Sequence, residues 1–297
     1  MTRFMLNAST RPYAVLGHPV KHSLSPQMQN AAFAAMGLDA VYLAFDTPPE
    51  RLGSVLPMLA ELGFAGVNLT VPLKETAFAF LEDLDDSARR LRSVNTVSIV
   101  EGRMRGYSTD GEGFLAAFRE EFNVTPAERR VCIVGCGGAG RAVAIACALA
   151  GARELWLLNR NVGRAERLAA ELGALMPSAG VHVAPARSDA WCAACHASQI
   201  VIQATSVGLR EDDPALLPAE AFCPGQWLYD LIYHVPQTPT MRAAHTAGAH
   251  TANGLGMLLH QGALSLKIWT GRDPPLACMR RALLAAMPQR SAAAGSV

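Results

Sequence analysis

Residues 131–152 read VCIVGCGGAGRAVAIACALAGA, and they indicate the fold class more clearly than any other segment. Residues 131–134 form a short apolar run rich in β-branched side chains, which is typical of a buried parallel strand. Gly135, Gly137 and Gly140 follow with the spacing G-x-G-x-x-G, and a helical pattern comes directly after them. Together with a second apolar run at 154–158, the stretch predicts a strand, a helix and a strand that bind a dinucleotide.

Each glycine of this turn has its own physical task. The first permits a tight turn, the second lets backbone N–H groups approach a pyrophosphate, and the third lets the helix pack closely on its strand. The start of the helix directs unpaired N–H groups and the positive end of its dipole at the phosphates. The alternative is a glycine-rich packing turn without a ligand, and the complete strand, helix and strand context favours the nucleotide site.

The residues after the second strand indicate which dinucleotide binds. An NAD site carries a carboxylate here, which accepts hydrogen bonds from the ribose 2′-hydroxyl. This sequence instead has Asn159 and Arg160, with Arg164 one helical turn later. A guanidinium binds a 2′-phosphate through paired, charge-assisted hydrogen bonds, so the sequence predicts NADP. The alternative is that both arginines are ordinary solvated surface charges.

Composition limits the class of protein. With 51% hydrophobic and 17% charged residues, the composition is typical of a globular protein. The length of 297 residues favours two domains. The net charge is +1. So small a net charge provides no field that attracts nucleic acid or an acidic membrane. The first ten residues, MTRFMLNAST, lack the long apolar core of a secretory signal, so we expect a cytoplasmic protein.

Cysteine and histidine patterns offer two further hypotheses, both of which we disfavour. Seven scattered cysteines do not suggest a disulfide framework. Residues 192–196, CAACH, match the c-type haem attachment motif, but attachment requires export, so we expect two mostly buried thiols. His18 and His22 are four residues apart, but Pro19 between them argues against a helix that would align them on zinc. We therefore predict no metal site.

The first part of the chain alternates predicted strands and helices, which indicates a mostly parallel sheet. Strands are predicted at 13–17, 41–45 and 65–71, and a hairpin at 95–100 and 104–107. Helices are predicted at 25–36, at 50–62, and from Lys74 to the Asp85 and Asp86 pair. The helix at 25 would begin with the Ser25 hydroxyl as its cap and Pro26 in its first turn.

The rest of the chain predicts a second domain. After a helix at 113–122, the polar stretch 123–130 is the expected hinge. Strands at 154–158, 181–184 and 200–204 and the stretch QWLYDLIY continue a Rossmann domain over 113–252. A long amphipathic helix after Asn253 is expected to return to the first domain, so that 253–297 completes the substrate domain of 1–112. The last residues, 291–297, are expected to be a frayed tail. The predicted fold is thus a two-domain α/β protein.

Several polar residues of the first segment fall at strand ends and in turns, where open α/β sheets bind their ligands. They are Ser23, Ser25, Asn68, Thr70, Lys74, Asn95, Thr109 and Asp110. Each has a structural alternative, such as a helix cap for Ser25 and Asp110 or a strand-end turn for Asn68. Their joint occurrence favours a substrate site.

Nine motifs together give the chain a family resemblance from Tyr13 to about Leu284. They are GHPVKHSLSP (17–26), GVNLTVPLKE (66–75), SVNTV (93–97), GYSTDGEGF (106–114), GCGGAGRA (135–142), NRNVGRAE (159–166), ATSVG (204–208), YDLIY (229–233) and NGLGMLLHQG (253–262). This ordered set resembles that of the shikimate dehydrogenases. The resemblance implies the two-domain fold predicted above and a reversible, NADPH-linked reduction of 3-dehydroshikimate to shikimate, in the pathway to chorismate and the aromatic amino acids.

The resemblance also implies roles for individual residues. Lys74 would be the proton donor and acceptor, with Asp110 beside it, and an ammonium group is chemically suited to stabilise the alkoxide that hydride delivery creates. Ser23 and Ser25 would bind the substrate carboxylate. The ring hydroxyls would be bound or covered by Thr70, Asn95, Asp110, Tyr233 and Gln261. The cofactor would be bound by Gly135, Cys136, Gly137, Gly138, Ala139, Asn159, Arg160 and Arg164, with Asp86, Leu231 and Gly254 near the nicotinamide.

The sequence departs from the family pattern at three positions, and one assignment has a strong alternative. Ser108 and Gln203 stand where asparagine is usual, and Asn161 stands where threonine is usual. Asn161 is closest to the expected 2′-phosphate, so the strictness of NADP over NAD stays open. Without the resemblance, Gln261 would be interpreted as a buried glutamine that bonds neighbouring backbone.

Three other hypotheses stay open. A quinate or dual quinate/shikimate dehydrogenase, with dual substrate or NAD use, shares the same motifs, and its substrate differs by one hydroxyl that pocket hydrogen bonds discriminate. The two serines and Arg160 favour shikimate with NADP. A non-catalytic NADP-binding regulator would have no need for Lys74 and Asp110, and a c-type cytochrome would need the haem. The protein is expected to be a monomer or a homodimer.

Overall fold

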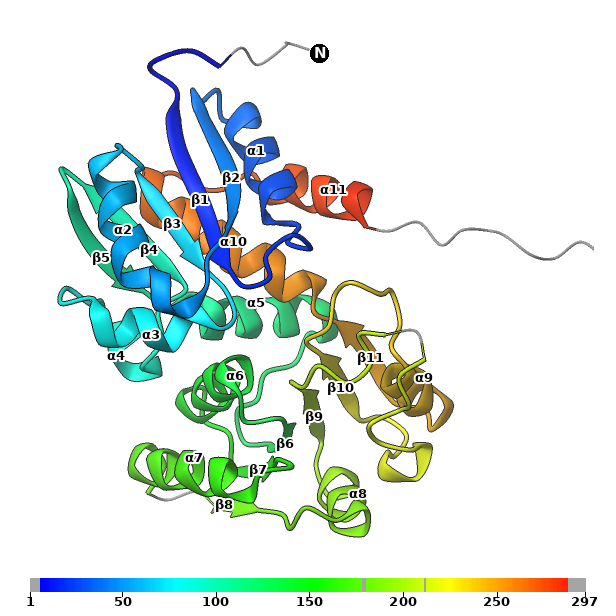
Figure 1. Cartoon of the computed structure of the whole chain (residues 1–297). Helices are drawn as coiled ribbons and strands as arrows, with labels where there is room; N and C mark the ends of the chain where they lie inside the picture. The colour runs from blue at the N-terminus through cyan, green and yellow to red at the C-terminus, as the bar shows by residue number, and fades with distance from the viewer. Residues whose placement is uncertain (1–5, 178–179, 211, 288–297) are drawn as a thin grey trace, which may run out of the picture.

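Two sheets, one in each of two lobes, organise the chain in the computed structural model, which describes residues 6–177, 180–210 and 212–287 (Figure 1). The predicted tail at 291–297 lies outside the described residues. The predicted two-lobed α/β architecture is confirmed. The division at residue 112 stays a prediction, because helix α5 (Asp110–Phe122) begins before that residue and packs against elements of both lobes.

The first sheet has five strands in the order β2-β1-β3-β4-β5. They are β1 (Arg11–Gly17), β2 (Ala40–Asp46), β3 (Gly66–Leu69), β4 (Thr96–Val100) and β5 (Arg103–Tyr107). β1 pairs in parallel with β2 and β3, whereas β4 and β5 form the predicted antiparallel hairpin. β1 lies between β2 and β3 and is parallel to both, so the connections that follow β1 and β3 begin side by side at the carboxyl ends of these strands. Ligands of open α/β sheets bind at such a position.

The second sheet has six parallel strands in the order β8-β7-β6-β9-β10-β11. They are β6 (Arg130–Val134), β7 (Glu154–Leu158), β8 (Gly180–Val183), β9 (Ile200–Gln203), β10 (Trp227–Asp230) and β11 (His250–Asn253). This is the strand order of dinucleotide-binding folds. Strands β7 and β8 are added on one side of β6 and strands β9 to β11 on the other, so the order reverses between β6 and β9. The sequence did not indicate β11, whose four residues, HTAN, carry no apolar run.

Helices cover both sheets, and one of them returns to the first lobe as predicted (Figure 1). The remaining helices are α1 (Ser25–Ala35), η1 (Pro49–Arg51), α2 (Leu52–Glu61), α3 (Leu73–Phe80), α4 (Asp86–Leu91), α6 (Gly138–Leu149), α7 (Val162–Leu175), α8 (Ser188–His196), η2 (Ala219–Ala221), α9 (Pro239–Thr246), α10 (Leu255–Thr270) and α11 (Leu276–Ala286). Leu259, Ala263 and Leu266 of α10 are buried in one core with residues of β1, β2, α1 and α11. α10 therefore closes the core of the first lobe rather than extending the second sheet.

Two local predictions in the first lobe were wrong. The helix that begins at Leu73 ends at Phe80, and a second helix begins at Asp86 with the Asp85 carboxylate accepting from the Ser87 N–H as its cap. The residues between the two helices pair with β5 instead, because Leu84 bridges Gly106 and the Asp85 N–H donates to the Gly106 carbonyl oxygen. The Ser25 hydroxyl is not a cap either: Ser25 is already helical, and the N-cap residue is Leu24.

The cysteine motif of residues 192–196 lies on α8. Cys195 is buried, with its Sγ 3.5 Å from the Sγ of buried Cys132, and Cys192 is half-buried, as expected for small core thiols. Among the residues that the structure describes, no three metal-binding side chains cluster. None of the described helices is long and apolar enough to cross a membrane.

Gly140 lies against the turn that precedes it, which gives a first testable prediction. A Cβ at position 140 would lie 1.8 Å from the Gly135 carbonyl oxygen, so Gly140→Ala must displace the glycine turn. We expect overpacking to cost about 1–3 kcal/mol of unfolding free energy and to weaken dinucleotide binding. The matched control is Gly173→Ala on α7, where a Cβ meets nothing within 4 Å and should stabilise by up to about 1 kcal/mol. Thermal unfolding and cofactor titration measure both effects, and equal behaviour of the two variants would contradict the prediction.

Candidate active site

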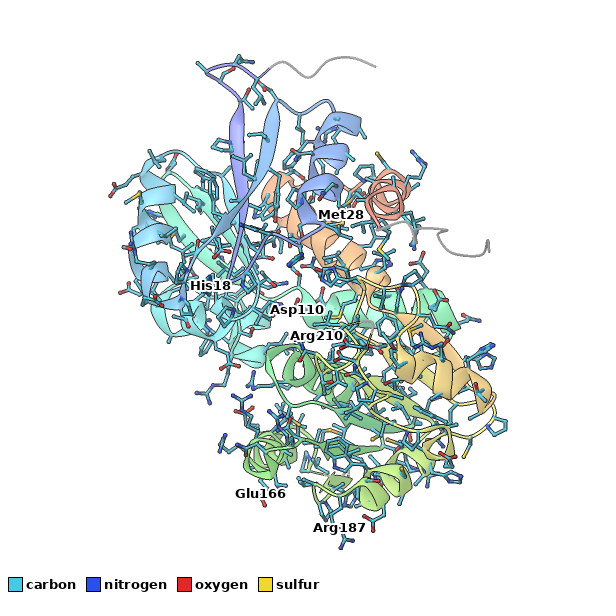
Figure 2. All side chains as sticks on the ribbon, turned by 45° about the vertical axis from the view of Figure 1, so that its right-hand side comes forward. His18, Met28, Asp110, Glu166, Arg187 and Arg210 are labelled. Carbon is cyan, nitrogen blue, oxygen red and sulfur yellow. The ribbon has the colours of Figure 1, made fainter. Side chains whose placement is uncertain are left out.

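A buried ion pair lies where the two lobes meet. Figure 2 shows Asp110 at this junction, and its Oδ2 lies 2.7 Å from the Nζ of Lys74. Lys74 is the second residue of α3, which follows β3 after a short turn, and Asp110 is the first residue of α5. The side chains are 16% and 4% exposed, respectively, so little water screens the pair.

The alternative role of Asp110 as a helix cap is wrong. The N-cap residue of α5 is Thr109, and no side chain caps this helix. The second carboxylate oxygen of Asp110 instead accepts from Asn95 Nδ2 at 3.0 Å. Both oxygens are therefore used by other predicted site residues rather than by the helix.

Gln261 joins the same hydrogen-bond network from the far end of the chain. Its Oε1 accepts from Asn95 Nδ2 at 3.2 Å, while its Nε2 donates to the Leu258 carbonyl oxygen at 2.9 Å. α5 and α10 can come this close because Gly113 has no side chain. A Cβ at this position would lie 2.7 Å from the backbone nitrogen of Gln261. Four predicted residues, Lys74, Asn95, Asp110 and Gln261, thus form one connected group.

A second layer of buried polar residues supports this group. Asn68 on β3 accepts from the Tyr42 hydroxyl at 2.6 Å and donates to Ser265 Oγ at 3.0 Å. It also donates to Thr96 Oγ1, which hydrogen-bonds Asn95 Oδ1. Tyr42, Thr96 and Ser265 were not among the residues predicted from the sequence. No local pattern reveals them, since each acts through partners distant in the sequence.

The other predicted substrate residues form no hydrogen bond with the connected group. Thr70 follows β3, and Ser23 and Ser25 precede and begin α1, where the Ser25 N–H donates to Ser23 Oγ at 3.3 Å. Tyr233 of the second lobe packs against the core cluster of the first lobe that contains Leu24. Burial raises the pKa of Tyr233 to about 12, so its hydroxyl is a neutral donor near pH 7. The neighbouring His234 ring lies 6.4 Å from that of His22, which places the two segments side by side.

The glycine turn of the second lobe has the predicted geometry. Gly135 has a φ of +105°, and the Cys136 N–H donates to Asn159 Oδ1 at 3.0 Å. α6 begins at Gly138 and includes Ala139, and a Cβ at Gly137 would meet nothing within 4 Å. This open side leaves room for a phosphate beside the helix start. Burial raises the pKa of the Cys136 thiol to about 11, against the opposing charge of Arg164, so no thiolate repels a phosphate here.

The end of β7 presents two arginines. Asn159 Nδ2 donates to the Asn161 carbonyl oxygen at 2.8 Å, and Asn161 caps α7 through its Oδ1. Arg160 and Arg164 are exposed, and within the described ranges no carboxylate lies within 4 Å of either guanidinium. Both side chains are therefore available to an anion.

Of the three residues predicted near the nicotinamide, the structure brings two together. A Cβ at Gly254 would lie 2.1 Å from the Leu231 carbonyl oxygen, and the Leu231 N–H donates to the Gln203 carbonyl oxygen at 2.8 Å. Both residues lie beyond the carboxyl ends of β9, β10 and β11. The Asp86 side chain is 79% exposed at the start of α4, and its ion-pair contact is Arg89 at 4.0 Å. Asp86 is not part of the connected group.

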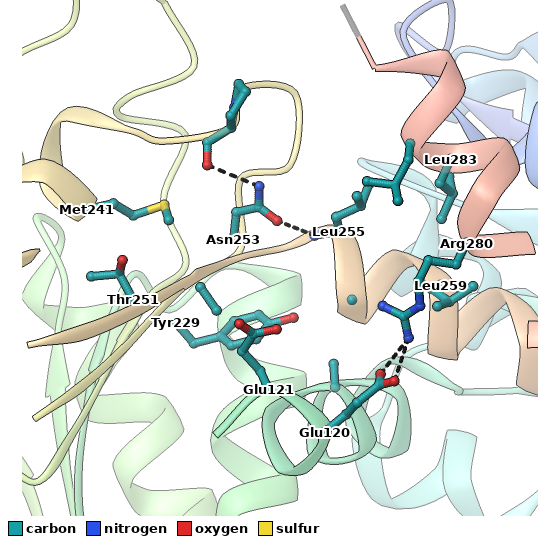
Figure 3. Close-up of a pocket in the computed structure, with 15 residues that line it drawn as sticks. Glu120, Glu121, Tyr229, Met241, Thr251, Asn253, Leu255, Leu259, Arg280 and Leu283 are labelled. Carbon is teal, nitrogen blue, oxygen red and sulfur yellow. Dashed lines mark hydrogen bonds and ion pairs between the residues drawn. The ribbon is translucent and has the colours of Figure 1, made fainter. Parts of the chain in front are cut away.

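A separate cavity of about 270 Å³ lies between α5, β11, α10 and α11 (Figure 3). Its wall contains the Arg280 Nη2 contact with both carboxylate oxygens of Glu120, at 2.6 and 2.7 Å. None of the predicted catalytic residues lines this cavity. Its volume alone therefore does not identify the site of chemistry, which is indicated by the buried ion pair.

Two family models match the chain. Residues 15–97 match the shikimate dehydrogenase substrate binding domain, and residues 254–284 match the shikimate 5′-dehydrogenase C-terminal domain. The chain is 45% identical to shikimate dehydrogenase (NADP(+)) of Moorella thermoacetica over 95% of each chain. It is 42% identical to the enzyme of the same name from Methanopyrus kandleri, over 94% of this chain and 97% of that one.

The similarity to shikimate dehydrogenases extends to solved structures. Shikimate 5-dehydrogenase from Thermus thermophilus, in complex with NADP(H) and shikimate, superposes with a TM-score of 0.83 at 39% identity. The similarity covers 93% of this chain and 100% of that one. It therefore extends over both lobes and the junction between them.

Proposed function

The chain belongs to the shikimate dehydrogenase family, and from that premise we propose that it catalyses the reversible, NADP-linked reduction of 3-dehydroshikimate to shikimate. The observation that carries the proposal is the buried Lys74 and Asp110 pair at the junction of a substrate lobe and a dinucleotide lobe. An oxidoreductase of this type needs a proton donor beside the reacting carbonyl, and a pure binding protein does not.

The second lobe fits NADP. The N–H groups at the start of α6 and the open side of Gly137 suit the pyrophosphate, and Arg160 and Arg164 suit the 2′-phosphate. Gly135, Cys136, Gly138, Ala139 and Asn159 complete the proposed binding turn, with Leu231 and Gly254 near the nicotinamide. For Asp86 only the resemblance to the family supports the assignment. When bound, the reduced cofactor supplies the hydride.

Lys74 is the proposed proton donor. Hydride delivery to a ketone leaves negative charge on the oxygen, and the Nζ ammonium stabilises that charge and transfers a proton to it. Asp110 holds the ammonium through the 2.7 Å contact, and Asn95 holds Asp110 in turn. In the reverse direction the neutral lysine accepts the proton from the substrate hydroxyl.

The substrate is proposed to lie against the connected group. Ser23 and Ser25 present hydroxyls for its carboxylate, while Thr70, Asn95, Tyr233 and Gln261 offer hydrogen bonds to its ring hydroxyls. The hydroxyl of Tyr233 remains a donor because burial raises the pKa of that group to about 12. The first lobe thus provides most of the polar partners, and Tyr233 reaches them from the second.

Removing the charge of Asp110 tests its role. In Asp110→Asn the side chain keeps its size but leaves the Lys74 ammonium without its counter-ion, so we expect kcat to fall about 100-fold. The affinity for NADP should stay within about twofold, because the phosphates bind elsewhere. Asp273→Asn is the matched control, since Asp273 forms a similar 2.8 Å contact with Lys267 but is 88% exposed. If kcat is the same in Asp110→Asn as in Asp273→Asn, Asp110 has no part in the mechanism.

The choice of substrate and cofactor is tested by one assay. The absorbance of reduced cofactor is followed with shikimate or quinate, each with NADP or NAD. We expect the largest kcat/KM with shikimate and NADP. Higher values with quinate would favour the quinate dehydrogenase hypothesis, and no turnover with any pair would favour the non-catalytic regulator.

We propose that the protein is cytoplasmic and that it is a monomer or a homodimer. All seven cysteines are free thiols, which suits a reducing compartment. Sedimentation analysis of the purified protein measures the oligomeric state, and a tetramer or larger assembly would contradict this expectation.

A further inference from the structure

One buried carboxylate has no part in the chemistry described above. Asp230 ends β10, and its side chain is fully buried. Burial raises the pKa of this carboxyl to about 6, although its two hydrogen bonds act in the opposite direction. A buried carboxylate is costly unless its oxygens are hydrogen-bonded, so its contacts indicate what it is for.

Asp230 fastens both ends of a loop, residues 231–238. Its Oδ1 accepts from the Ile232 N–H at 3.0 Å, near the start of the loop. Its Oδ2 accepts from Thr238 Oγ1 at 2.6 Å, at the end of the loop. Thr238 is also fully buried, and its Oγ1 caps α9 by accepting from the Met241 N–H at 3.1 Å.

This loop carries the residues of the second lobe that are proposed to face substrate and nicotinamide. Leu231 and Tyr233 belong to it, and Tyr233 reaches the core cluster of the first lobe. The Gly254 N–H donates to the Ile232 carbonyl oxygen at 3.0 Å, which holds the loop against the start of α10. The position of the loop therefore determines where both residues lie relative to the lobe junction.

We propose that Asp230 and Thr238 are positioning residues, which hold the loop of residues 231–238 so that Tyr233 meets the substrate and Leu231 meets the nicotinamide. The proposal rests on the proposed function. If stability alone were needed, apolar side chains of similar size would serve as well as a buried polar pair. A need to hold the loop in one position explains the buried polar pair better, since a displacement of about 1 Å at a reacting centre costs about 100-fold in rate.

Variants of Thr238 test the proposal with little change in volume. Thr238→Val removes the hydroxyl, and we expect KM for shikimate to rise about tenfold and kcat to fall about tenfold because the reactants are misplaced. The Kd for NADP should change less than about twofold, because the phosphate contacts lie on another loop. Thr238→Ser keeps the hydroxyl and should restore both constants. Thr246→Val is the matched control on the same helix, where the hydroxyl is exposed and bonds only the Arg242 carbonyl oxygen.

A double-mutant cycle tests whether the pair acts through Tyr233. If it does, Thr238→Val should cost less in kcat/KM in a Tyr233→Phe background than in the unmodified protein. Asp230→Leu, which removes both acceptor oxygens, should behave as Thr238→Val does in the same cycle. The proposal would be overturned if the losses in kcat/KM were strictly additive and the main effect of Thr238→Val were a lowered Tm.

Hydrogen exchange separates this proposal from the proposed function. Amides of residues 231–238 should exchange faster in Thr238→Val than in the unmodified protein, whether or not the enzyme turns over shikimate. Unchanged exchange would overturn the positioning role, as would faster exchange with unchanged kinetics. A protein inactive on shikimate and quinate would instead refute the proposed function, and the exchange result would still report on the anchoring.

Discussion

Lys74→Ala is expected to lower kcat about 1,000-fold and to leave the Kd for NADP within about twofold of its original value. Removing a positioned proton donor typically costs 100-fold to 10,000-fold, and alanine also removes the charge that stabilises the developing alkoxide. The loss should therefore lie in the chemical step. Steady-state kinetics with shikimate and a fluorescence titration with NADP measure the two quantities.

The chain contains a matched control for this variant. Lys267 lies 2.8 Å from Asp273, almost the same separation as in the Lys74 pair, but its side chain is 57% exposed. Lys267→Ala removes the same group and the same charge, and it should leave kcat unchanged. Full activity in Lys74→Ala would remove this lysine from the mechanism.

Replacing both Arg160 and Arg164 with alanine is expected to raise the Kd for NADP about 100-fold and to leave the Kd for NAD nearly unchanged. Each guanidinium is exposed, so we assign each phosphate contact about 1.4 kcal/mol, near the lower end for charged hydrogen bonds, or tenfold in affinity. NAD lacks the 2′-phosphate and loses none of these contacts. Titrations of both cofactors at one fixed salt concentration measure the change in preference.

The control for charge is a second double variant. Arg103 and Arg187 are exposed on β5 and at the start of α8, so replacing both with alanine changes the net charge equally. This control should alter neither affinity. A parallel loss of NADP and NAD binding in the Arg160 and Arg164 variant would mean that these residues support the fold rather than select the cofactor.

The nucleotide lobe could be predicted from the sequence because its signals are local. Residues 131–140 carry the strand, the turn and the helix start within ten positions, and the backbone requires the glycines there. A Cβ at Gly140 would lie 1.8 Å from the Gly135 carbonyl oxygen, and Gly135 has a positive φ. Such steric demands act over a few residues, so they are visible in a short stretch.

The strand ends and turns of the first segment indicated where the candidate site lies, but only the family resemblance gave its residues their roles. Lys74 and Asp110 are 36 positions apart, and they meet because β3 and the hairpin of β4 and β5 pair in one sheet. The supporting contact of Asn68 with Ser265 spans 197 positions. Spacing and periodicity carry no information on contacts of this kind, which is why Tyr42 and Ser265 were missed.

The wrongly predicted long helix of the first lobe has the same cause. The helix predicted from Lys74 to Asp86 is interrupted because Leu84 and Asp85 pair with Gly106, which lies about 20 positions further along the chain. The helical periodicity of Phe78 and Leu81 gave no sign of that partner. Tertiary pairing overrode a local preference, as it also did in the short polar strand β11.

A crystal structure of the protein with NADP and shikimate bound together tests the role of Lys74 most directly. We expect Lys74 Nζ to lie within about 3 Å of the reacting hydroxyl, with the nicotinamide approaching from the second lobe. A complex in which this amine faces bulk solvent while the substrate lies elsewhere would refute the proposed mechanism.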